Sequence, residues 1–157
     1  MPKQKTTTEM EDILAELKYS FVTITREYSW EMGHALMNHK GKCYNIHGHN
    51  YRMEVEIRGD INPNTGMVMD FSQVDDIIES VIIKYDHKLF MNKKDPRMKL
   101  VQEAYPFEGE PTAENLAWVL FYKTDLAIDD EYANDTPRLE RVTLYETDKA
   151  SATVLRS

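Results

Sequence analysis

Apolar and charged residues alternate along the segment that follows the histidine-rich part of the chain. Tyr51, Met53, Val55 and Ile57 are separated by single charged residues. A period of two is typical of a β-strand with one buried face and one face in water. Further strands are indicated by β-branched and aromatic residues at 20–28, 141–147 and 152–156.

Two later segments show the spacing of an amphipathic helix. The apolar positions of the first recur every three or four residues, at Val74, Ile77, Ile78, Val81, Ile82 and Tyr85. Ser72 is expected to cap this helix, because serine often accepts a hydrogen bond from the first turn. The second helix is expected from Thr112 to about Leu126.

The remaining segments are rich in turn-forming residues. Residues 59–66 predict a turn, after which residues 67–71 are expected to form the short second arm of a hairpin. Residues 86–111 and 129–137 are expected to be connections. We expect residues 1–17 to be a flexible N-terminal extension, in which the apolar residues Met10, Ile13, Leu14 and Leu17 could form a short amphipathic turn.

The order of these elements predicts the fold class. Strands and helices do not alternate one to one, which disfavours a doubly wound parallel sheet. We expect residues 18–157 to form a single α+β domain, in which an antiparallel sheet carries two helices on one face.

Composition narrows the classes of function. The chain has 157 residues, with 27 acidic and 19 basic side chains and a net charge of −8. This balance disfavours binding to nucleic acid or to an anionic membrane. No apolar run approaches the roughly 20 residues needed to cross a bilayer, and residues 1–8 lack the apolar core of a signal peptide. The single cysteine fits a reducing compartment, so we expect a cytoplasmic protein.

Four of the five histidines lie within 16 residues around that cysteine. His47 and His49 are two apart in a predicted strand, so their imidazoles point to the same face. Two such imidazoles suit a metal ion such as zinc, although a His-x-His pair is also common on surfaces without a metal. A catalytic zinc site normally has three protein ligands. The third ligand could be His34 or His39, and the spacing does not decide between them.

Other candidate residues allow more than one interpretation. Cys43 could act as a base or nucleophile in its thiolate form, could bind the metal, or could be a small buried apolar residue. Asp86 and His87 could form a general acid/base pair or a polar helix end. Glu146 could hold an amidine-like edge of a ligand by paired hydrogen bonds, or be a solvated strand carboxylate.

Several ordered motifs resemble the 6-pyruvoyl-tetrahydropterin synthase / 6-carboxytetrahydropterin synthase family. The resemblance covers about residues 20–156, and its motifs lie at residues 28–34, 43–51, 62–71, 85–89, 111–115 and 145–148. It implies a tunnelling fold, with a four-stranded antiparallel sheet and two helices on one face. It also implies a homo-hexamer of two trimers with active sites between subunits.

The resemblance implies a role for individual residues. The implied zinc ligands are His34, His47 and His49. The implied catalytic acid/base set is Cys43, Asp86 and His87. Glu146 is implied as the anchor of the pterin and Thr112 as a further pterin contact, while His39 is left as a loop residue.

The spacing around the cysteine favours one branch of the family. Three residues separate Cys43 from His47, as in the 6-carboxytetrahydropterin branch, whereas animal pyruvoyl enzymes have a longer insert. The implied reaction converts 7,8-dihydroneopterin triphosphate to 6-carboxytetrahydropterin, acetaldehyde and triphosphate, in queuosine-type deazapurine biosynthesis. Ala35 departs from the arginine of many relatives. The alternatives are 6-pyruvoyl-tetrahydropterin synthase and a non-catalytic zinc- or pterin-binding module. Because the chain is acidic, lysines near the site such as Lys40 or Lys42, or a neighbouring subunit, are expected to supply the positive charge that attracts the triphosphate.

Overall fold

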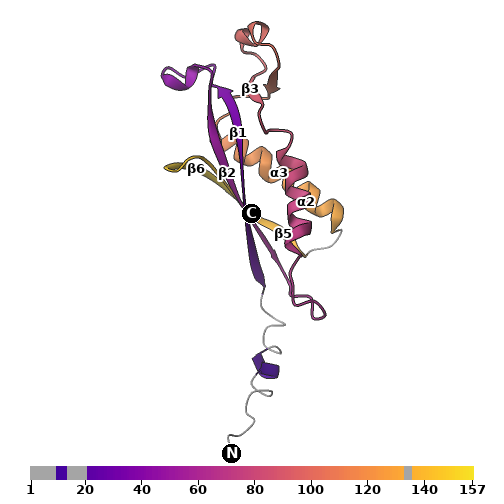
Figure 1. Cartoon of the computed structure of the whole chain (residues 1–157). Coiled ribbons are helices and arrows are strands. Elements are labelled where there is room, and N and C mark those ends of the chain that lie inside the picture. The colour runs from indigo at the N-terminus through magenta and orange to yellow at the C-terminus, as the bar shows by residue number, and fades with distance from the viewer. Residues whose placement is uncertain (1–9, 14–20, 133–135) are drawn as a thin grey trace, which may run out of the picture.

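Six strands form one sheet, and two α-helices cover one of its faces (Figure 1). The computed structural model describes residues 10–13, 21–132 and 136–157. The strands lie in the order β4-β3-β1-β2-β5-β6. In chain order the elements are β1 (Val22–Ala35), η1 (Lys42–Tyr44), β2 (His47–Gly59), α2 (Phe71–Ile82), β3 (Leu89–Asn92), η2 (Pro96–Leu100), β4 (Ala104–Phe107), α3 (Ala113–Glu131), β5 (Arg138–Thr147) and β6 (Ala150–Leu155).

The predicted α+β class is confirmed, and the sheet is larger than expected. Strands β1, β2, β5 and β6 pair antiparallel, as the sequence predicts. Strands β3 and β4 extend the sheet at one end by parallel pairing, with β3 bound to the last three residues of β1. Each of these two strands has only four residues, which is too short to show a period-two pattern, so the sequence predicted loops there.

The long pairing of β1 with β2 sets which side chains share a face. The register runs without a break from Val22 opposite Gly59 to His34 opposite His47. One face of this pair carries a buried row that includes Trp30, Met32, Tyr51 and Met53. This face lies under α2 and α3, whereas the residues between these positions lie on the other, more polar face of the sheet.

Helix α2 buries its predicted apolar stripe but begins earlier than predicted. Asp70, and not Ser72, is the N-cap, because the Asp70 carboxylate accepts the backbone N–H of Ser72 at 2.8 Å. The Ser72 hydroxyl also donates to Asp70, at 2.7 Å. The expected hairpin arm at residues 67–71 is wrong. That segment is a turn closed by Asn62, which bonds to Met67 and Gly66 through its backbone, and Phe71 is the first residue of α2.

Helix α3 begins where the sequence predicts and ends later. Thr112 is its N-cap, with its hydroxyl accepting the N–H of Asn115 at 3.4 Å. The helix continues past Leu126 to Glu131, since Ile128 still packs in the core while the acidic residues beside it face solvent.

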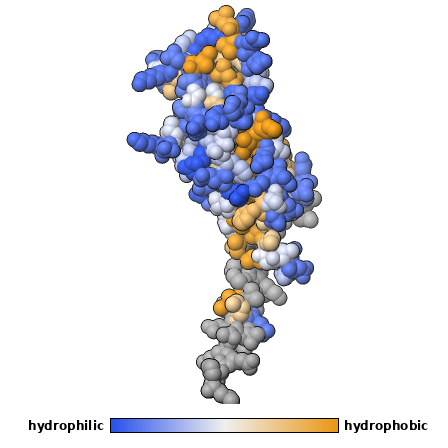
Figure 2. Space-filling model, in the orientation of Figure 1, coloured by the Kyte–Doolittle hydropathy of each residue, from blue (hydrophilic) through white to orange (hydrophobic). Residues whose placement is uncertain are grey.

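Parts of the N-terminal prediction fall outside the described residues, including Leu14 and Leu17. Residues 10–13 are helical, and Met10 and Ile13 are exposed. None of the helices in the described ranges is long and apolar enough to cross a membrane. Figure 2 shows a mostly hydrophilic surface with small separate apolar patches, as the acidic composition leads one to expect.

Candidate metal centre and catalytic residues

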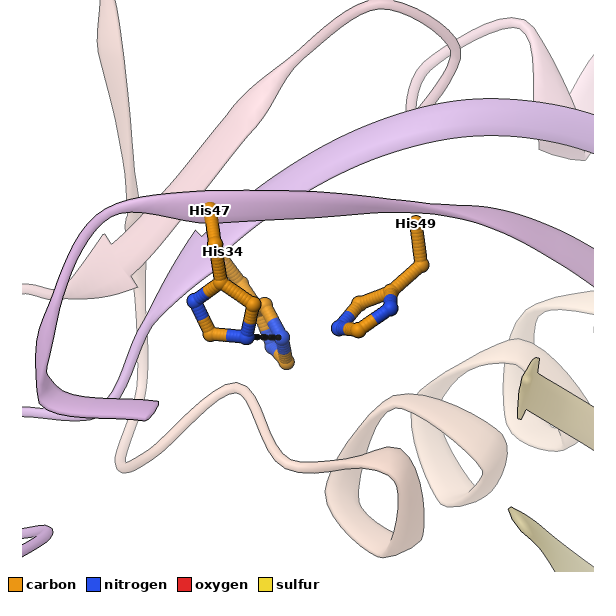
Figure 3. Close-up of side chains that lie close together, drawn as sticks. All are labelled: His34, His47 and His49. Carbon is orange, nitrogen blue, oxygen red and sulfur yellow. Dashed lines mark hydrogen bonds between the residues drawn. The ribbon is translucent and has the colours of Figure 1, made fainter. Parts of the chain in front are cut away.

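Three histidines converge at one end of the β1–β2 pair. His34 lies directly opposite His47 in the register, and His49 lies two residues further along β2. Their side chains therefore share one face of the sheet and point toward one another (Figure 3). One nitrogen of each ring lies within 4.8 Å of the others. The Nε2 atoms of His34 and His47 are 3.1 Å apart.

Backbone carbonyls orient two of the three rings. The Nδ1–H of His34 donates to the Pro111 carbonyl at 2.8 Å, and the Nδ1–H of His47 donates to the Asn45 carbonyl at the same distance. A proton held at Nδ1 leaves Nε2 of each ring free to bind a metal. The chain thus fixes the tautomer that a metal centre at this position requires.

Burial favours the neutral form of the imidazoles. It lowers the pKa of His34 and of His49, and in both cases the nearby Glu146 carboxylate opposes this effect. Metals bind neutral imidazole, so these directions suit a metal site at neutral pH. The His49 Nε2 atom is buried without a hydrogen-bond partner among the described residues, although Glu146 Oε1 lies 3.4 Å away. A metal ion would satisfy this buried atom.

The structure decides between the two candidates for the third ligand. His39 lies in the exposed loop after β1, where its Nδ1 accepts the backbone N–H of Gly41 at 2.9 Å. His34 is 1% exposed and belongs to the cluster. The group that could hold a metal is therefore His34, His47 and His49.

Glu146 lies beside this cluster, with its Oε1 atom 3.4 Å from Nε2 of His49. Burial raises the pKa of Tyr51, and the negative charge of the nearby Glu146 adds to this effect. Cys43 lies in the short helix η1 and is partly exposed, and its carbonyl accepts the N–H of Leu36 at 2.9 Å. The structure thus places Glu146 beside His49, and Cys43 in the short helix between the two strands that carry the histidines.

Asp86 and His87 form a second cluster with Glu31. The Nδ1 of His87 bonds to Asp86 Oδ1 at 2.8 Å, and its Nε2 lies 3.9 Å from Glu31 Oε2. The backbone of His87 has a φ of 56°, in the left-handed region that non-glycine residues rarely adopt. Its N–H donates to the Glu31 carbonyl at 2.7 Å, which holds this conformation against β1. Strain of this kind is often found at functional positions.

The second cluster lies on the opposite face of the sheet from the histidine cluster. Side chains of a strand alternate between faces, so Glu31 points away from the side that carries His34. A cavity of about 550 Å³ lies beside this cluster, and its lining includes Glu31, His87 and Lys88 together with His47 and His49. Within one chain, the Asp86–His87 pair therefore lies with Glu31, across the sheet from the side chain of His34.

Glu110 supports the histidine cluster from a distance, and the sequence gives no signal for this role. Glu110 accepts the N–H of Met37 at 2.8 Å and the side-chain amides of Asn38 and Asn92 at 2.7 and 3.1 Å. It therefore fixes the loop after β1 beside Pro111, whose carbonyl orients His34. These bonds join positions more than 15 residues apart, so only the folded chain shows them.

Comparisons with known proteins agree with this geometry. A family model described as 6-pyruvoyl tetrahydropterin synthase matches residues 23–157. The chain belongs to this family. The 6-carboxy-5,6,7,8-tetrahydropterin synthase of Haemophilus influenzae is 34% identical to this chain over 110 residues, which cover 62% of the chain and 78% of that protein. The protein of the same name from Aquifex aeolicus is 32% identical over 120 residues, which cover 71% of the chain and 74% of its own length.

A solved structure supports the same assignment. The 6-pyruvoyl tetrahydropterin synthase of Caenorhabditis elegans aligns with a TM-score of 0.66 and 29% identity, over 89% of the chain and 99% of that structure. The resemblance inferred from the sequence motifs and the tunnelling fold that it implies are thus confirmed. The chain is a member of a family of pterin synthases.

Proposed function

We propose that this chain is a zinc-dependent 6-carboxy-5,6,7,8-tetrahydropterin synthase. The observation that carries the proposal is the convergence of three imidazoles beside Glu146. Backbone carbonyls orient two of them, and the third has a buried nitrogen without a hydrogen-bond partner among the described residues. The names of the Haemophilus and Aquifex relatives support the carboxy product, as does the three-residue spacing between Cys43 and His47. The reaction would serve queuosine-type deazapurine biosynthesis.

The donor set suits zinc. Three neutral nitrogen ligands are typical of a catalytic zinc site, which keeps the fourth position open for substrate. Bound zinc would supply Lewis-acid polarisation of the substrate's side-chain hydroxyls. His34, His47 and His49 would hold it, with the Pro111 and Asn45 carbonyls fixing two of the rings.

The protein residues have separate roles in this proposal. Glu146 accepts hydrogen bonds from the amidine-like edge of the pterin, for which two carboxylate oxygens are well matched. Cys43 moves protons at the substrate side chain, and the Asp86–His87 pair accepts or returns them. Thr112, beside the carbonyl that orients His34, is a further candidate contact for the pterin.

The two faces of the sheet support an oligomer with shared sites. Glu31, which lies beside His87, points to the opposite face from His34, so a neighbouring subunit would supply the Asp86–His87 pair to the histidine side. We therefore propose a homo-hexamer of two trimers with active sites at subunit interfaces.

We propose that Lys40 and Lys42 attract the triphosphate. Both lysines are exposed in the loop that contains Cys43, and their positive charge offsets the net −8 of the chain locally. Replacing both by alanine should raise the KM for the triphosphate substrate. An unchanged KM would remove these lysines from the account.

A second candidate within the family is 6-pyruvoyl-tetrahydropterin synthase. The family model and the Caenorhabditis elegans structure carry that name. This enzyme would eliminate triphosphate but keep the carbon chain of the substrate, so the two candidates differ in whether acetaldehyde is released.

Catalysis is tested by comparing the zinc-loaded protein with its Cys43→Ala variant. Both are incubated with 7,8-dihydroneopterin triphosphate, and the release of triphosphate and the zinc content are measured. We expect the variant to keep zinc and to lose turnover at least about 100-fold, as expected for loss of a general acid/base. Zinc binding by both proteins with turnover by neither would instead indicate a zinc- or pterin-binding module, and equal turnover by both would remove Cys43 from the reaction.

A further inference from the structure

We propose that Arg97 is a positioning residue that fixes the turn carrying Cys43. The inference rests on the proposed function, because it takes Cys43 as the catalytic thiol. Arg97 lies in η2, more than 50 residues from Cys43 in the sequence, and reaches the turn through its side chain.

One edge of the Arg97 guanidinium is bound to a buried carboxylate. Its Nε lies 2.9 and 3.1 Å from the two oxygens of Asp95, and its Nη2 also bonds to Asp95. The Asp95 side chain is fully buried, and Arg97 lowers its pKa through these bonds. Asp95 also caps η2 by accepting the backbone N–H of Arg97 at 2.9 Å. The guanidinium is therefore held in one orientation.

The other groups of the same guanidinium contact Tyr44, the residue after Cys43. Nη1 donates to the Tyr44 carbonyl, and the guanidinium carbon lies 3.9 Å from the centre of the Tyr44 ring, within the range of a cation–π contact. Arg97 thus binds Asp95 through Nε and Nη2 and donates from Nη1 to the Tyr44 carbonyl. The plane of its guanidinium lies over the Tyr44 ring.

The turn that carries Cys43 has few other anchors. Helix η1 has no buried residue and no side-chain cap. Its other contacts with neighbouring segments include the bond from the Leu36 N–H to the Cys43 carbonyl. A turn without a buried side chain depends on such polar contacts for its position, so loss of Arg97 should let Cys43 move. A displacement of about 1 Å at a reacting group can lower the rate up to about 100-fold.

Arg26 provides a matched control. It also uses Nε and Nη2 on a carboxylate, that of Asp75, and it also lies over an aromatic ring, that of Phe71 at 5.6 Å. Its partners are on α2, far along the sheet from the histidine cluster. Arg26→Ala removes a comparable ion pair without touching the Cys43 turn.

The test compares Arg97→Ala, Arg97→Lys and Arg26→Ala in the zinc-loaded protein. Three quantities are measured: kcat and KM, zinc content, and the rate at which iodoacetamide alkylates the only cysteine of the chain. We expect Arg97→Ala to lower kcat about 10- to 100-fold and to raise the alkylation rate several-fold, with KM and zinc content within about twofold. Arg97→Lys should recover little of the lost kcat, since a lysine ammonium cannot make the paired bonds to Asp95 or stack on the Tyr44 ring. Arg26→Ala should lower thermal stability and leave kcat and alkylation unchanged.

Two results would overturn the proposal. Wild-type kcat and alkylation in Arg97→Ala would show that Arg97 does not control Cys43. A raised KM that Arg97→Lys restores would show that Arg97 binds the substrate by its charge. Failure of the proposed function is separate, because the wild-type protein itself would then show no turnover.

Discussion

The five histidines differ in what their ring nitrogens contact. His34 and His47 each donate one proton to a carbonyl, and His49 has a buried nitrogen without a hydrogen-bond partner in the described parts of the chain. His39 accepts a bond from its own loop, and the His87 ring lies between two carboxylates. Identical side chains thus fall into three environments. His34, His47 and His49 offer three imidazoles to one metal ion, whereas His87 could share an ion only with the carboxylates of Glu31 and Asp86.

These environments lead to a prediction about metal binding. His49→Gln should reduce bound zinc from about one per chain to well below that, because two imidazoles rarely hold zinc tightly enough. His39→Gln is the matched control, and we expect it to keep the full zinc content. The measurement is metal analysis after dialysis. If His49→Gln kept its zinc and His39→Gln lost it, His39 and not His49 would be the third ligand.

Burial of His34 and His49 predicts how stability depends on pH. Their pKa values are lowered in the folded protein from an ordinary 6.5, so the unfolded chain binds more protons just below that pH. The free energy of unfolding of the metal-free protein should therefore fall as the pH is lowered from about 7 to about 5. Urea titrations across this range measure it. His34→Gln should flatten the dependence, and an unchanged slope in that variant would contradict the assignment.

At the scale of elements, the strength of the sequence pattern decided which predictions were correct. The alternation at residues 51–57 and the helical spacing at residues 74–82 correspond to β2 and α2, because each pattern continues over several turns or pairs. Residues 67–71 were assigned to a strand on weak turn signals, but residues 67–70 form no strand and Phe71 begins α2. Strands β3 and β4 were missed, since their parallel pairing depends on distant partners.

The start of α3 gives a prediction at the same scale. Thr112→Ala should lower the free energy of unfolding by about 1 kcal/mol, because the first turn loses its side-chain cap. Thr112→Ser keeps the hydroxyl and should stay close to wild type. Denaturant unfolding measures the effect, and the KM of the alanine variant shows whether Thr112 also contacts the pterin. An alanine variant as stable as wild type would contradict the capping role.

At the scale of the whole molecule, the sheet separates two sets of chemical groups. The histidines and Glu146 lie on the face that the helices cover, and the Asp86–His87 pair lies on the other face with Glu31. The residue types of both sets were visible in the sequence. Their separation was not, because it depends on strand register and on the backbone of His87, and no spacing in the sequence reports either one.

This separation predicts that two inactive variants can complement each other. When Cys43→Ala and His87→Ala chains are co-expressed, about a quarter of the sites in a mixed oligomer should combine an intact Cys43 with an intact His87 from a neighbour. Steady-state turnover of the mixture, compared with each variant alone, measures this. No recovery from mixed oligomers would show that each chain builds its own complete site.

The identity of the product tests the central claim most directly. The zinc-loaded protein is incubated with 7,8-dihydroneopterin triphosphate, and the pterin product and acetaldehyde are quantified by mass spectrometry. The account predicts 6-carboxytetrahydropterin with an equal amount of acetaldehyde. A pterin that keeps its three-carbon side chain, formed without acetaldehyde, would contradict it.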